Sequence, residues 1–124
     1  IAFEDGFGEG LEDGRVRAVA AYSAGLDGLG YQPNGRSLLH FLSENDAFNP
    51  FDAAVAWDDA NIVDPRWTVA LWGADHSGPY FDPDDPHFDL VADTTVNFLD
   101  QELKGASWER LFVGVAWSDV AGFV

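Results

Sequence analysis

The stretch from residue 67 to residue 80, Trp-Thr-Val-Ala-Leu-Trp-Gly-Ala-Asp-His-Ser-Gly-Pro-Tyr, constrains the fold of this chain most. Its first part, residues 68–72, is a short run of β-branched and aromatic residues that predicts a buried strand. Gly73 ends this strand, and His76 follows on a loop at its carboxyl end. Ligands and catalytic groups gather at that edge of open α/β sheets, so His76 is a candidate general base.

Alternation of apolar strands with helical patterns predicts an α/β fold in a single domain spanning residues 1–124. The strands are almost continuously apolar, which is typical of parallel strands covered on both faces and joined by right-handed crossovers. Gly105 follows the longest helical pattern in the position that commonly ends a helix. The predicted strands are 16–22, 37–43 and 68–72; the predicted helices are 50–60 and 86–104, with a short helical turn over 107–111 and no element in 112–124.

Three parallel strands form a thin sheet with two exposed edges, which soluble proteins normally avoid. We therefore expect this chain to be the C-terminal portion of a larger sheet.

The charge balance is strongly acidic. The chain has 22 Asp and Glu residues against 6 Lys and Arg, a net charge of -16, and Lys104 is its only lysine. This excludes a nucleic-acid partner and an anionic membrane surface, which both require clustered basic residues. The composition suits a salt-rich, halophilic environment that screens self-repulsion, and an acidic face for a basic partner is the alternative.

Other classes of site are not indicated. The chain has no Cys, so a disulfide framework and a thiolate site are excluded and the cellular location is undecided. No apolar run is long enough to span a bilayer. The acidic stretch around Asp82 to Asp89 does not have the spacing of an EF-hand loop, so we expect neither a metal ion nor a cofactor.

The two remaining histidines are predicted to be structural. His40 lies inside a predicted strand and is expected to pack against a neighbour, whereas His87, in the first turn of a helix, is expected to be exposed. Tyr80 and Phe81, just beyond His76, are candidates for the lining of an acyl pocket.

An acidic residue follows the second predicted strand just as His76 follows the third. Asp46 ends the segment Ser43-Glu44-Asn45-Asp46. This order of acid and histidine, over residues 15–111, resembles the C-terminal part of the α/β-hydrolase fold. The helix containing Phe98-Leu99-Asp100 and Leu103-Lys104-Gly105 is similar to the last large helix of dienelactone-hydrolase-like and polyester-hydrolase-like serine esterases. Ser43 stands where those relatives often carry Gly.

The resemblance implies a Ser-His-Asp triad in which His76 is the general base and Asp46 orients its imidazole. Asp75 is the alternative acid, although neighbours on a tight loop rarely face each other. Asp46 has an alternative role as well, because a loop carboxylate there can cap the helix that starts at Pro50.

The nucleophile is missing from its usual motif, because the chain contains no Gly-x-Ser-x-Gly. In one hypothesis the nucleophile lies upstream of Ile1; in the other, Ala21-Tyr22-Ser23-Ala24-Gly25 is the elbow. We favour the first, because the glycine-rich segment after Ser23 is poor helix material and no further strand fits before Ser37.

Two functions follow. In the first, the chain is part of a serine hydrolase acting on small-molecule carboxylic esters, with the N-terminal half supplied by a preceding segment or a separate chain. In the second, it is an acidic, non-catalytic α/β interaction domain of hydrolase ancestry.

Overall fold

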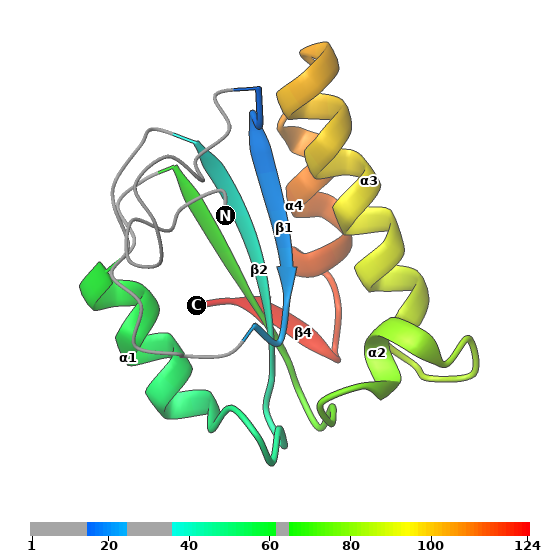
Figure 1. Ribbon diagram of the computed structural model, residues 1–124. Coiled ribbons are helices and arrows are strands. Elements are labelled where there is room, and N and C mark those ends of the chain that lie inside the picture. Colours follow the sequence, from blue (N-terminus) through cyan, green and yellow to red (C-terminus); the bar gives the residue numbers. More distant parts are fainter. Residues whose placement is uncertain (1–14, 25–35, 62–64) are drawn as a thin grey trace.

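The computed structural model describes residues 15–24, 36–61 and 65–124. These residues form an α/β structure in which a four-stranded sheet is flanked by helices (Figure 1). In chain order the elements are β1 (Ala18–Tyr22), β2 (Ser37–Ser43), α1 (Phe51–Asn61), β3 (Arg66–Leu71), α2 (Gly78–Phe81), α3 (Phe88–Lys104), α4 (Glu109–Ala116) and β4 (Ala121–Phe123).

The three long strands lie side by side in the order β1, β2, β3, and both pairings are parallel. The strand prediction is therefore confirmed in type and nearly in bounds. The expectation of a purely parallel sheet is wrong, because β4 adds an antiparallel strand beside β3, with Val69 opposite Phe123. The expectation of no element in 112–124 is also wrong, because residues 112–116 belong to α4 and β4 follows it. A strand of three residues is too short to show an alternating pattern.

Two backbone hydrogen bonds next to the strand pairing hold β4 against β3. The Trp72 amide donates to the Val120 carbonyl at 2.8 Å, and the Val124 amide donates to the Thr68 carbonyl at 3.1 Å. A Cβ on Gly122 would lie 3.5 Å from the Trp72 indole, an ordinary van der Waals distance, so a small side chain would fit beside this ring. The strand depends on tertiary contacts rather than on its own propensity.

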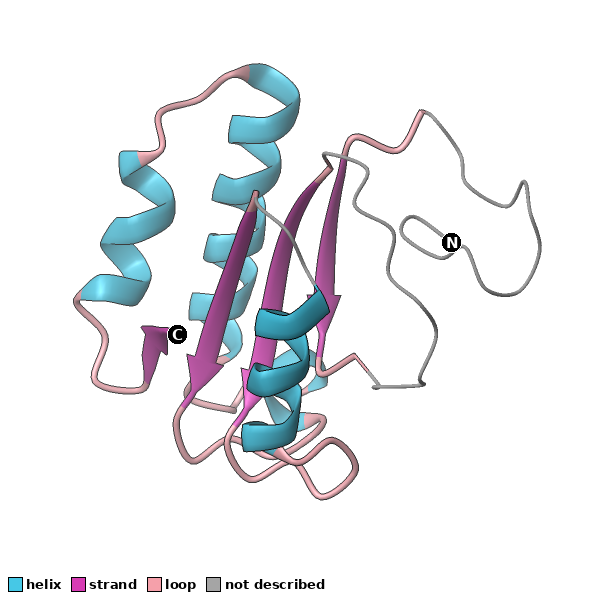
Figure 2. Ribbon diagram, turned by 90° about the vertical axis from the view of Figure 1, so that its left-hand side faces the viewer, coloured by secondary structure: helices cyan, strands magenta, loops and turns pink. Residues whose placement is uncertain are grey.

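Helices cover both faces of the sheet, with α1 on one side and α3 and α4 on the other (Figure 2). The larger core lies between the sheet and α3 and α4. Phe98 from α3, Leu111 and Val115 from α4, and Leu39 and Phe41 from β2 are all buried there. Burial of this apolar surface is the main force that fixes α3 against the strands.

The helix boundaries follow local chemistry. Helix α3 ends as predicted, because Gly105 adopts a left-handed φ of 70° and its amide bonds the Gln101 carbonyl at 2.9 Å. The start of α3 lies at Phe88 rather than Pro86, and the short helix α2 was not predicted. Helix α4 is longer than the predicted turn and continues to Ala116, with Leu111 and Val115 buried in the core. Just before this helix, Trp108 packs on Trp67 with ring centroids 4.4 Å apart.

No helix within the described ranges is long and apolar enough to cross a membrane. In this part of the chain β1 is an edge strand, and its residues are only partly buried. The continuation of the sheet beyond β1 remains a prediction.

Candidate active site at the carboxyl ends of the parallel strands

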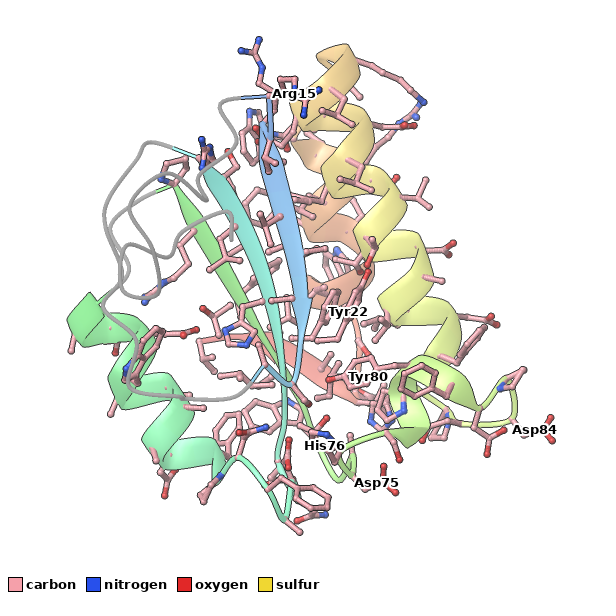
Figure 3. The ribbon with its side chains drawn as sticks, in the orientation of Figure 1. Arg15, Tyr22, Asp75, His76, Tyr80 and Asp84 are labelled. Atoms are coloured by element: carbon pink, nitrogen blue, oxygen red, sulfur yellow. The ribbon has the colours of Figure 1, made fainter. Side chains whose placement is uncertain are left out.

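The site is built on the loops that leave β2 and β3. The carboxyl ends of parallel strands lie on the same side of a sheet, so the two loops are neighbours. They bring Asp46 and His76 together. Nδ1 of His76 lies 2.8 Å from Oδ2 of Asp46. The Asp46 side chain is only 1% exposed, whereas that of His76 is 39% exposed. The imidazole is therefore held by a buried carboxylate and is partly open to solvent; Figure 3 labels His76 on the loop beyond the strands.

The second carboxylate oxygen of Asp46 is also occupied. Oδ1 accepts backbone N–H bonds from Phe48 at 2.8 Å and Asn49 at 2.9 Å. Both amides precede α1, which begins at Phe51, so Asp46 fixes the loop before the helix and does not cap the helix itself. The predicted capping role is therefore wrong, and the other carboxylate oxygen makes the contact with His76.

Burial by itself raises the pKa of Asp46. The hydrogen bond from His76, the backbone N–H bonds of Asn49 and Phe48 and attraction to the imidazole outweigh burial and leave the pKa below its usual value. An ionised carboxylate only accepts, so Nδ1 of His76 carries the donated proton. The other ring nitrogen, Nε2, is then the one that can take a proton.

The alternative acid Asp75 is committed elsewhere. Its Oδ1 accepts the backbone N–H groups of Ser77 at 2.9 Å and Gly78 at 2.7 Å. These bonds, from Gly78 first and Ser77 second, lower the pKa of Asp75. Asp75 shapes the turn after His76, and Asp46 is the carboxylate that bonds the imidazole.

Ser23, the alternative nucleophile, lies directly after β1 and is buried. It has a φ of 42°, a left-handed conformation uncommon for a residue with a side chain. Its Oγ lies 2.9 Å from the Tyr80 hydroxyl and 3.3 Å from Oγ of Ser43. Among the described residues these two hydroxyls, and not His76, are its side-chain partners. The segment 25–35, whose glycine-rich sequence was the reason to doubt an elbow at Ser23, lies outside the described residues.

Sequence reasoning missed this hydroxyl cluster of Ser23, Ser43 and Tyr80. The Tyr80 hydroxyl also lies 3.1 Å from Oγ of Ser43, which closes the triangle. Burial raises the pKa of Tyr80, so the phenol stays protonated and can donate. The only available signal was Ser43 itself, a hydroxyl where the resembling family often carries Gly.

An apolar pocket of about 510 Å³ opens beside His76. Figure 3 shows Tyr22 and Tyr80 above His76 on this side of the sheet. On the loop after Asp46, the Phe48 ring lies edge-on to the imidazole at 4.8 Å and is 77% exposed. The candidates Tyr80 and Phe81 do line the pocket. Its lining is Tyr22, His76, Pro79, Tyr80, Phe81, Phe88, Val91 and Ala92.

The other two histidines differ from each other. His40 packs as predicted: it is buried, and its Nδ1 lies 2.8 Å from Oδ2 of Asp58 on α1. The prediction that His87 is exposed is wrong, because the residue is only 4% exposed. His87 lies just before α3, and its ring is enclosed between the Asp85 carboxylate and the backbone carbonyl of Trp72, which follows β3.

No cluster of three or more His, Asp or Glu side chains suited to a metal ion occurs in residues 15–24, 36–61 and 65–124. Comparisons of the chain with protein-family models, with curated proteins and with solved structures found no match. The functional argument therefore depends on the geometry of the site.

Proposed function

We propose that this chain supplies the general base and its orienting acid to a serine hydrolase that cleaves carboxylic esters. The observation that carries the proposal is the Asp46–His76 pair, with its 2.8 Å bond, buried carboxylate and exposed imidazole. A base held by a buried acid, with its second nitrogen available, is the arrangement that activates a serine hydroxyl.

In this proposal His76 Nε2 removes the proton from a serine hydroxyl as the serine oxygen attacks the ester carbonyl. Asp46 stabilises the resulting imidazolium through Nδ1 and keeps its own negative charge. The imidazolium then gives its proton to the departing alkoxide, which leaves an acyl-serine. Water attacks this acyl group in a second, equivalent cycle and releases the carboxylic acid.

The nucleophile and the oxyanion hole come from outside the described residues. The edge strand β1 is the place where further strands of the sheet would add, and it ends beside the pocket at Tyr22. A preceding segment of the same protein, or a separate chain, would bring the serine to this edge. The burial of Ser23 and its bonds to other hydroxyls support its role as a bystander.

Labelling with a fluorophosphonate probe tests the placement of the nucleophile. The sample is this chain together with the segment or separate chain proposed to supply the serine, and intact-mass and peptide analysis locates the label. We expect one label on a serine outside residues 1–124. A label on Ser23 would show that the nucleophile had been misplaced. Absence of any label would overturn the esterase proposal and favour the acidic interaction domain.

Substitutions test the two acids directly. With a p-nitrophenyl ester, we expect Asp46→Asn to lower kcat by about 10⁴-fold, because Asn favours the wrong tautomer of His76. Asp75→Asn is the matched control: Asn can still accept the two backbone N–H bonds, so kcat should fall by less than about tenfold. Equal losses in both variants would remove the assignment of Asp46.

A further inference from the structure

His87 contacts two hydrogen-bond acceptors at the same time. Its Nδ1 lies 2.8 Å from Oδ1 of Asp85, and its Nε2 lies 2.9 Å from the backbone carbonyl oxygen of Trp72. Oδ1 of Asp85 also accepts the His87 backbone N–H at 2.8 Å, which identifies this oxygen as an acceptor. A carbonyl has no proton to give. Both contacts can be hydrogen bonds only if each ring nitrogen carries a proton.

We propose that His87 is a buried imidazolium that positions the loop carrying His76. It acts through its two partners and does not touch a substrate, so it is a positioning residue. The part of the proposal that concerns catalysis rests on the proposed esterase function, whereas the protonation state of His87 does not.

The partners of His87 lie on both sides of His76 in the chain. Trp72 is the residue at which β3 passes into the loop, four residues before His76. On the other side, the Asp85 carboxylate packs against Gly78, where a Cβ would come within 2.5 Å of Oδ2. The imidazolium therefore links the entry and the exit of the short loop whose shape sets the His76–Asp46 contact.

The surroundings suit a positive charge. No Lys or Arg occurs between residues 67 and 103, so within this stretch His87 has only acids as charged neighbours along the chain. Carboxylates close to an imidazolium stabilise it, particularly where the ring is shielded from water.

Loss of one proton would break the link. A neutral imidazole donates from only one nitrogen, so the other would place a lone pair against an oxygen at hydrogen-bond distance. One of the two contacts must then lengthen, and either the Trp72 end or the Asp85 end of the loop is released.

The direct test is nitrogen NMR of the histidine rings in the protein labelled with ¹⁵N-histidine. Only three histidines occur, and His87→Gln identifies the signals of His87. At pH 7.5, where an exposed imidazole is mostly neutral, we expect both ring nitrogens of His87 to be protonated. A single protonated nitrogen at that pH would overturn the proposal, whatever the enzyme activity.

The positioning role is tested by kcat and KM of this chain together with the part proposed to supply the serine. In His87→Gln we expect kcat to fall about tenfold or more while KM changes little, because His76 is misplaced. Asp85→Asn should also lower kcat, because it weakens the bond that holds the His87 ring to the end of the loop.

His40→Gln is the matched control, because it replaces a buried histidine on the α1 side that also bonds an aspartate. It should lower stability and leave kcat unchanged. An unchanged kcat in both Asp85→Asn and His87→Gln would refute the positioning role. An absence of esterase activity in every variant, with a doubly protonated His87 still seen by NMR, would refute the proposed function alone.

Discussion

The hydroxyl of Tyr80 lies 2.9 Å from Oγ of Ser23 and so ties the segment following His76 to the end of β1. Ser23 holds this position with a φ of 42°. A left-handed conformation costs about 1 kcal/mol for a residue with a Cβ and nothing for glycine. The contacts of its hydroxyl must offset that cost.

Two substitutions at Ser23 separate the hydroxyl from the backbone strain. Ser23→Ala loses the hydrogen bonds and keeps the strain, so we expect it to lower the free energy of unfolding by about 1–2 kcal/mol. Ser23→Gly also loses the bonds but relieves the strain and should be more stable than the alanine variant by about 0.5–1 kcal/mol. Urea denaturation measures the free energy of unfolding of both variants. An alanine variant as stable as the glycine variant would contradict the claim that the backbone of Ser23 is strained.

Gly78 and Gly114 should respond to alanine in opposite directions. A Cβ on Gly78 would meet the Asp85 carboxylate at 2.5 Å, and that carboxylate is held by His87. We expect Gly78→Ala to destabilise by about 1–3 kcal/mol through overpacking. Gly114 lies in α4 with nothing within 4 Å of its Cβ position, so Gly114→Ala should stabilise by about 0.5–1 kcal/mol. Thermal melts of the two variants against the wild type provide the check.

Stability should fall in acid partly through Asp46. The folded-state pKa of Asp46 lies below its usual value, so its ionised form stabilises the folded protein above the unfolded pKa, about 4. This contribution is lost as the pH falls through the folded value. Asp46→Asn lacks it, so the stability advantage of the wild type at pH 6 should shrink as the pH falls below about 4.

Asp93→Asn, which removes an exposed carboxylate from α3, controls for the loss of a charge. Denaturant melts from pH 2 to pH 7 give the comparison. The same loss and the same pH profile in both variants would show that Asp46 has no special linkage to folding.

Salt should stabilise the protein. With a net charge of -16, the folded chain repels itself at low ionic strength, and counterions screen this repulsion. We expect Tm to rise by about 5 °C or more between 0.01 M and 1 M NaCl. A midpoint that stays flat or falls over this range would remove the argument for a salt-rich habitat.

Local patterns were sufficient to predict the three parallel strands and the longest helix. Apolar runs such as Ser37–Ser43 are buried along their whole length, and α3 shows the periodicity of a helix with one face in the core. The Asp46–His76 contact was also predictable, because parallel strand ends share one edge of the sheet and the two residues follow neighbouring strands.

Features that depend on distant partners could not be predicted in this way. The burial of His87 depends on the carbonyl of Trp72, 15 residues away in the chain. The hydroxyl cluster joins Ser23 to Tyr80 across 57 positions, and β4 depends on contacts with β3. None of these contacts leaves a periodic signal, so a single sequence gives no basis for expecting them.

The two outer strands of the described sheet differ in length, and this has a consequence for assembly. Strand β1 offers five residues of backbone to a partner, whereas β4 offers three. Very short edge strands are poor templates for pairing. If further strands add to the described sheet, we therefore expect them to pair with β1 rather than with β4.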